Sequence, residues 1–169
     1  MLNTVALEQL ATHLRELLKL DTEIILNPNH FEELSKKVEE NLESFKIENF
    51  ENCDGRSWLL LENEKNFTIR LWGDKETRFY DLVKYLSFAF ILDRKSLNHS
   101  QLQHSEYLLP RLNGYEEEYL MLAFMIPRKA LLSTITQYSS SDNSTVDIVE
   151  MNKNVNKYCY KRAKDLHFW

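Results

Sequence analysis

The chain has 169 residues, a formal net charge of −5, and 43% hydrophobic and 12% aromatic residues. This length suits one globular domain with a buried core, and the composition lies far from that of disordered chains. The negative charge argues against a general nucleic-acid-binding protein, because neutralising phosphates requires a basic surface. Gly and Pro number three each, which predicts a helix-rich fold with few tight turns.

Two N-terminal helices are predicted, because apolar side chains recur at steps of three and four in residues 3–20 and 31–45. Residues 22–26, between these segments, fit either a short strand or a connector. Asn29 is the predicted N-cap of the second helix, and Glu32 completes a capping-box-like pair. Each helix has a single apolar stripe and therefore needs a surface to pack against.

The middle of the chain has the pattern of a β-hairpin. Residues 57–61 and 67–72 are β-rich runs joined by a polar link. Alternate residues of the second run, starting at Phe67, are expected on the core face. Residues 75–92 follow and are strongly apolar. They predict a central, buried helix on which the hairpin packs.

The rest of the chain is predicted to be helical. The expected helices cover residues 114–126, 128–137, 146–154 and 157–168, with a polar linker at 139–144. The predicted fold class is α+β: a helix-rich domain with a small antiparallel sheet packed on a buried central helix, and a C-terminal helix pair.

The cysteines and the N-terminus bear on the compartment. Cys53 and Cys159 lie far apart and match no metal-binding spacing, which predicts free, buried thiols in a reducing compartment. The N-terminal segment carries acids and lacks the basic and apolar regions of a signal peptide. No apolar run approaches the ~20 residues of a membrane span. We therefore expect a cytoplasmic protein that does not contact a membrane.

Four segments carry motifs in a recognisable order: Asp54-Gly-Arg-Ser57, Arg78-Phe79, residues 116–127 and residues 146–166. In this order they resemble the ImmA/IrrE family of gluzincin-like metallopeptidases, many of which are encoded beside phage or mobile-element repressors. The segments match, in turn, the start of the first central strand, the Arg-Phe pair of the active-site helix, the helix that supplies a Glu ligand, and the C-terminal helix pair. The resemblance implies a single zincin-like domain over residues 1–169, divided into N-terminal helices (1–50), a peptidase-like core (54–135) and a C-terminal helix pair (145–169).

The residues that carry the family's chemistry are absent. Its His-Glu-x-x-His motif should begin five residues after Arg78, where this chain has Val83, Lys84 and, at the second His position, Ser87. Zinc binding needs two imidazoles at i and i+4, and catalysis needs a Glu beside the first to accept a proton from the metal-bound water. We therefore expect no catalytic residues, no metal and no cofactor at these degenerate positions.

Three acidic residues lie near the family's Glu ligand: Glu116, Glu117 and Glu118. One of them could occupy the ligand position without a metal to bind. The simpler interpretation is an exposed first helical turn, where carboxylates complement the helix dipole. His99 and His104 are spaced by five residues in a predicted loop and fit no standard zinc site. We expect solvated histidines there.

The segment 157–164 mixes basic and aromatic residues and could contact nucleic acid or an acidic partner. The simpler interpretation is a helix that packs Tyr158, Ala163 and Leu166 inward and leaves its Lys and Arg side chains in solvent.

The resemblance implies a catalytically inactive, peptidase-like regulatory protein of phage or mobile-element origin. It would bind a helix-turn-helix repressor of the XRE type, or a similar regulator, through protein–protein contacts. Direct nucleic-acid binding is not expected. One alternative is an active metallopeptidase with a displaced metal site built from His99, His104 and a Glu of residues 116–118. Another is an antitoxin, or an inhibitor of a host defence protein, whose partner is a toxin or that defence protein.

Overall fold

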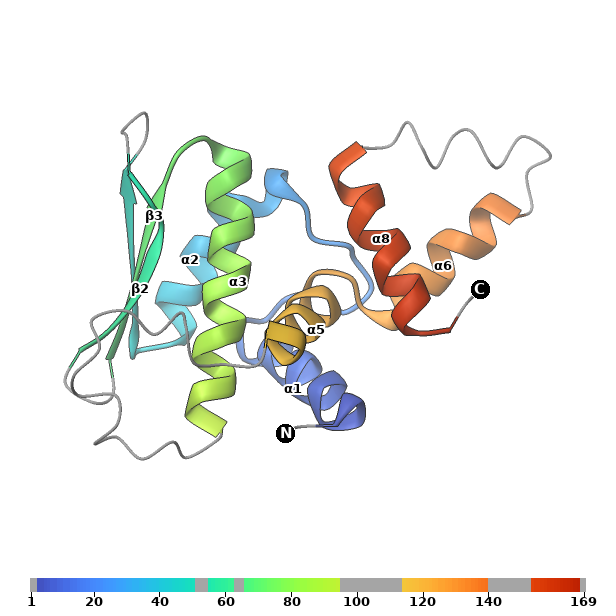
Figure 1. The fold of residues 1–169 in the computed structure, drawn as a ribbon, viewed down its shortest axis with the longest axis horizontal. Helices are drawn as coiled ribbons and strands as arrows, with labels where there is room; N and C mark the ends of the chain where they lie inside the picture. The colour runs from blue at the N-terminus through green and yellow to red at the C-terminus, as the bar shows by residue number, and fades with distance from the viewer. Residues whose placement is uncertain (1–2, 51–54, 63–65, 95–113, 140–152, 168–169) are drawn as a thin grey trace.

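The computed structural model describes residues 3–50, 55–62, 66–94, 114–139 and 153–167. Figure 1 shows a small sheet on one side of the molecule, with α2 and α3 on the same face of it and the other helices beyond them. The α+β class is confirmed. The elements are α1 (Thr4–Leu17), the 3₁₀ helix η1 (Pro28–His30), α2 (Phe31–Asn41), β1 (Phe45–Phe50), β2 (Trp58–Glu62), β3 (Asn66–Trp72), α3 (Lys75–Arg94), α5 (Gly114–Met125), α6 (Arg128–Ser139) and α8 (Lys153–Asp165).

The sheet has the strand order β1-β3-β2, in which β2 is antiparallel and β1 is parallel to the central β3. The predicted hairpin is therefore confirmed, but the sheet is mixed rather than antiparallel. Phe67, Ile69 and Leu71 of β3 are buried, as their alternation predicts.

Strand β1 corrects the assignment of residues 31–45 to one helix. Helix α2 ends at Asn41, and the next residue, Leu42, has extended backbone angles. Phe45 then pairs with Phe67, and Ile47 pairs with Ile69. The apolar residues near the end of the helical stripe also suit the alternation of a strand, and the parallel partner lies 22 residues further along the chain. Local periodicity cannot predict a pairing with such a distant strand.

Two details of the N-terminal half are now defined. Residues 22–26 form the connector, not the strand, of the two alternatives, and the Leu26 N–H donates to the Met125 carbonyl at the end of α5 (2.9 Å). The predicted cap, Asn29, and its partner Glu32 are wrong: Asn27 caps η1, which leads directly into α2, and its capping-box partner is His30. The N-cap position of α2 itself is His30, which makes no side-chain capping bond there. Pro28 explains the shift, because proline favours the first helical position and so places the cap one residue before it.

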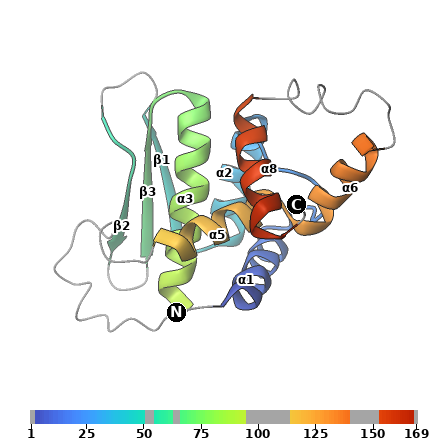
Figure 2. The same ribbon diagram turned by 45° about the vertical axis from the view of Figure 1, so that its right-hand side comes forward.

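Helix α3 is the central buried helix, as predicted, and continues to Arg94. Asp74 caps it by accepting from the Thr77 N–H (2.8 Å). Helix α5 packs on both α1 and α3, and Figure 2 shows it crossing α3. The core therefore continues from the sheet through α3 and α5 to α1. Its fully buried residues include Leu14, Phe79, Leu86 and Phe124.

The helices predicted at 114–126 and 128–137 are confirmed as α5 and α6, with bounds that differ by one or two residues. Helix α8 begins at Lys153, four residues before the expected start at Lys157, and ends at Asp165. Nearly all of the predicted helix at 146–154 and of the linker at 139–144 lies outside the described residues.

Candidate functional site

The three degenerate motif positions lie together on α3 but face two environments. Val83 and Ser87 have no exposed surface, because they are one helical turn apart on the side that faces the core. Lys84 is exposed, and its Nζ lies 5.7 Å from the centre of the Tyr85 ring. A hydrocarbon, a hydroxyl and a solvent-facing ammonium group do not fit a zinc ion with its general base. We derive no metal chemistry at this site.

Ser87 is unusual in this core. Its Oγ atom is buried and has no hydrogen-bond partner among the described residues. A buried hydroxyl without a partner destabilises the folded state by the desolvation penalty of that group. Ser87 is therefore expected to stabilise the core less than an apolar residue of similar size would.

The acidic residues at the start of α5 do not all lie in solvent. Glu116 is only 1% exposed, so the interpretation as an exposed carboxylate is wrong for this residue. Glu117 is half-buried, and Glu118 is exposed and forms an ion pair with Lys161. One side of the first turn of α5 is buried because this helix packs against α1 and α3, while Tyr115 and Glu118 on the other side are exposed.

The described residues contain no group of three or more His, Cys, Asp or Glu side chains that could hold a metal ion. His99, His104 and Cys53 lie outside the described residues, so the displaced metal site stays a prediction. His30 has a structural role, since its Nδ1 accepts from the Asn27 N–H (3.0 Å).

A fully buried arginine, Arg15, holds the end of α5. Its Nε donates to the Phe124 carbonyl (2.6 Å), its Nη2 to the Met125 carbonyl (3.0 Å) and its Nη1 to the Asp21 carbonyl. The last carbonyls of a helix lack partners within the helix, and a guanidinium supplies several donors in a fixed geometry. Burial lowers the pKa of Arg15 to about 10, and nearby Asp21 opposes that shift. The side chain is therefore still a cation at neutral pH.

A second buried arginine corrects the expectation for the C-terminal helix. Arg162 has no exposed surface, whereas its side chain was expected in solvent. Its Nη2 donates to Glu8 Oε1 (2.6 Å), its Nε donates to the Ile126 carbonyl (3.2 Å), and its guanidinium lies 5.2 Å from the centre of the Tyr119 ring. The Tyr119 hydroxyl donates to the same Glu8 oxygen (2.8 Å).

The inward packing of the other α8 residues is confirmed. Ala163 is buried, and Tyr158 and Leu166 are half-buried against the core. Helical spacing also predicts that Arg162 faces the core, because it lies four residues from both Tyr158 and Leu166. The expectation that it lies in solvent rested only on its charge.

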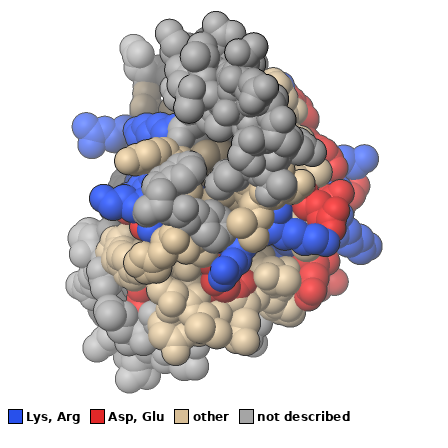
Figure 3. Space-filling model, turned by 90° about the vertical axis from the view of Figure 1, so that its right-hand side faces the viewer, with Lys and Arg blue, Asp and Glu red and all other residues tan. Residues whose placement is uncertain are grey.

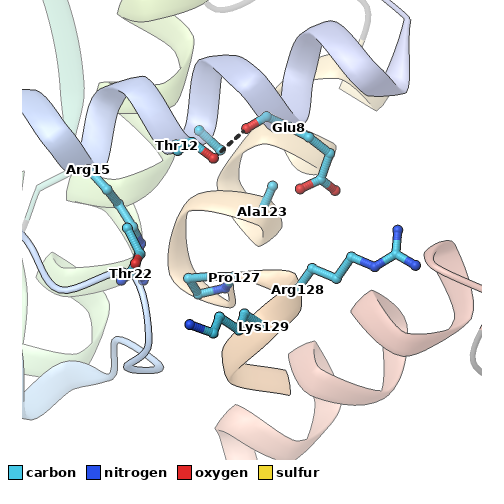
Figure 4. Close-up of a pocket in the computed structure, with 9 residues that line it drawn as sticks. Glu8, Thr12, Arg15, Thr22, Ala123, Pro127, Arg128 and Lys129 are labelled. Atoms are coloured by element: carbon cyan, nitrogen blue, oxygen red, sulfur yellow. Dashed lines mark hydrogen bonds between the residues drawn. The ribbon is translucent and has the colours of Figure 1, made fainter. Parts of the chain in front are cut away.

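A pocket of about 220 Å³ lies beside Arg15, between α1 and the start of α6 (Figure 4). It is lined by Glu8, Ala11, Thr12, Arg15, Thr22, Ala123, Pro127, Arg128 and Lys129. Its charged groups already interact within the chain: Lys129 pairs with Glu23, Glu8 with Arg162, and Arg15 with backbone carbonyls. Arg128 also has a partner within the chain. The pocket is a polar hollow whose charges are largely compensated.

The sheet has a second face, opposite to the face covered by α3 (Figure 1). Aromatic side chains of all three strands lie on it, as the register of the strands indicates. Phe50 and Trp72 stack with their ring centres 4.3 Å apart. The Arg70 guanidinium lies 4.5 Å from the centre of the Trp58 ring, and its Nε donates to Glu48 (2.5 Å). These side chains are half-buried. They form a mixed aromatic and charged surface on the outer side of the sheet.

The two edges of the sheet differ. The edge of β1 lies beside α2, and there the Ile47 N–H donates to Glu39 Oε1 (3.2 Å). Strand β2 is the other edge, and no strand in the described part of the chain pairs with its outer side. An edge strand presents a row of backbone donors and acceptors to which an extended segment can add.

Cys159 of α8 is a free, half-buried thiol, and burial raises its pKa to about 11 from an ordinary value of 9.0. The thiolate is the reactive form, so we expect Cys159 to react with iodoacetamide at pH 8 about a hundredfold more slowly than an unperturbed thiol. The measurement uses a Cys53→Ser variant, with the same variant in urea as the unperturbed control. Equal rates in the folded and unfolded chains would contradict this expectation.

Comparison of the chain with protein-family models, curated proteins and solved structures finds no match. The resemblance to the ImmA/IrrE family therefore rests on the motif residues alone. Among the described residues, no helix is both long and apolar enough to cross a membrane. Figure 3 shows basic and acidic side chains interspersed over the described part of the face that carries α6 and α8. That mixture does not resemble the basic surface of a nucleic-acid-binding protein.

Proposed function

We propose that the chain is a catalytically inactive, peptidase-like protein of phage or mobile-element origin that acts in the cytoplasm by binding a protein regulator. The observation that carries the proposal is the contrast between α3 and the sheet. Val83 and Ser87, which the resemblance aligns with metal ligands of the ImmA/IrrE peptidases, are enclosed in the core. The neighbouring β2 edge lacks a partner strand among the described residues.

The edge strand β2 suggests how the partner binds. An extended segment that adds to β2 gains backbone hydrogen bonds along the strand. The half-buried side chains beside that edge supply contacts for alternate side chains of the segment. They include Trp58 and Leu60, which lie on the outer face of β2 in register with Arg70 and Thr68. We propose that the bound segment belongs to a helix-turn-helix repressor of the XRE type or to a similar regulator.

The test is co-purification of the full chain with each helix-turn-helix protein encoded beside its gene. The expected result is a complex in which mass spectrometry finds the partner intact. Leu60→Lys places a charge at the β2 edge and should weaken binding at least tenfold. Leu132→Lys, at a 42%-exposed position on α6, is the matched control and should leave binding unchanged.

Other outcomes separate the alternatives. Cleavage of the partner, abolished by a chelator, would contradict the proposal and support a displaced metal site. Stoichiometric zinc in the purified chain would also contradict it. If the neighbouring helix-turn-helix proteins do not bind but a toxin or defence protein encoded nearby does, the chain is an antitoxin or an inhibitor instead.

A further inference from the structure

Few of the described side chains of α8 are fully buried. Of its residues and those just after it whose burial is described, only Arg162 and Ala163 are fully buried. Helix α1, by contrast, buries Leu7, Leu10 and Leu14. Because apolar stabilisation scales with the area removed from water, the described part of α8, where Tyr158, Cys159 and Leu166 are only half-buried, gains less from docking than α1 does.

The surface under α8, which we name the α8 dock, consists of Glu8, Tyr80, Glu118, Tyr119 and Ile126. Arg162 reaches Glu8, the Tyr119 ring and the Ile126 carbonyl. Tyr158 lies with its ring centre 4.9 Å from that of Tyr80, and Lys161 pairs with Glu118 at the exposed rim. The dock thus connects α8 to α1, α3 and α5 mainly through polar and aromatic groups.

The central contact of the dock is a buried charge with incomplete compensation. Arg162 Nη1 is buried and has no hydrogen-bond partner among the described residues. Removing a guanidinium from water is offset here by one carboxylate, one carbonyl and one ring face. The Glu8 side chain is 32% exposed, so its carboxylate is only partly removed from water. The desolvation penalty of a buried charge offsets much of the attraction to its partner, whereas removing that partner is strongly unfavourable. Docking of α8 therefore depends on Glu8.

We propose that α8 is a releasable helix whose docked state is controlled by the Glu8–Arg162 ion pair. Release returns the Arg162 guanidinium to water, exposes the partly buried Glu8 further and uncovers the α8 dock, while the sheet, α3 and α5 keep their own buried core. A free helix of 13 residues is only marginally stable in water. Its backbone amides therefore exchange with solvent when it leaves the dock. This inference does not depend on the function proposed above.

The test is hydrogen–deuterium exchange of the full chain, followed by mass spectrometry of peptides from α3, α5 and α8. In the wild-type chain, amides of α8 are expected to exchange at least tenfold faster than those of α3. Glu8→Gln should speed the exchange of α8 by about a further tenfold and leave α3 unchanged. The matched control is Glu118→Gln, which removes a carboxylate from the exposed rim of the same dock and should change α8 exchange less than twofold.

The double variant Glu8→Gln/Arg162→Met separates a charge effect from lost packing. Removing both partners leaves no uncompensated buried charge, so protection of α8 should return to within about threefold of the wild-type value. The proposal is overturned if α8 and α3 exchange at the same rate, or if Glu8→Gln speeds both equally. It is also overturned if the double variant is as unprotected as Glu8→Gln.

Discussion

Replacing Arg15 with methionine is expected to lower the free energy of unfolding by about 3–5 kcal/mol, because three hydrogen bonds from a charged donor, each worth about 1.5–3 kcal/mol, are lost. Arg15 is 1% exposed and donates to the carbonyls of Asp21, Phe124 and Met125. Methionine replaces the aliphatic stem of Arg15 but has no guanidinium and no donor, so these acceptors lose their partner inside the protein. Buried acceptors without partners are costly because they gave up hydrogen bonds to water on folding.

Urea unfolding of the variants measures this effect. Arg15→Met should lower the denaturation midpoint without changing the m-value. Arg15→Lys should fall in between, because an ammonium cannot reproduce the planar arrangement of the guanidinium donors. Lys129→Met is the matched control: it removes a cation from an exposed ion pair with Glu23 and should leave the midpoint unchanged. An Arg15→Met midpoint equal to that of Lys129→Met would contradict the role assigned to Arg15.

The elements that the sequence predicts well are those whose signal is local. The stripe of α3 contains Phe79, Leu82 and Leu86, and all three are fully buried. The alternation in β3 and the polar link before it also identify the hairpin with β2. Strand β1 was missed because its partner is distant in the chain and its apolar spacing also fits a helix. The mixed character of the sheet was missed for the same reason.

The candidate site divides in the same way. Residue type alone shows that zinc cannot bind at Val83, Lys84 and Ser87. Residue type does not predict the burial of Glu116 and Arg162, because charged side chains are exposed in most proteins and their burial depends on partners elsewhere in the fold. Arg162 meets Glu8, which lies 154 positions away in the sequence. No local pattern contains that contact.

The double variant Val83→His/Ser87→His is expected to lower the free energy of unfolding by about 4 kcal/mol in the absence of metal. Both positions have no exposed surface, and a buried polar group without a partner costs roughly 1–3 kcal/mol in proteins. Ser87→Ala is the matched control, since it removes a hydroxyl that lacks a hydrogen-bond partner among the described residues. It should leave stability unchanged or raise it slightly.

Adding zinc to this double variant tests the resemblance to the ImmA/IrrE peptidases. Histidines at 83 and 87 have the i, i+4 spacing of a zinc pair, and buried Glu116 lies on α5, which packs against α3. If α3 is a degenerate active-site helix, free zinc at a hundred times its dissociation constant should restore about 2.7 kcal/mol. Adding Glu116→Gln to the double variant should abolish that recovery. Urea midpoints with and without zinc measure both effects. If zinc restores no stability, or restores as much without the Glu116 carboxylate, the result would contradict descent from a zinc peptidase. In either case Glu116 would not be a third zinc ligand beside α3.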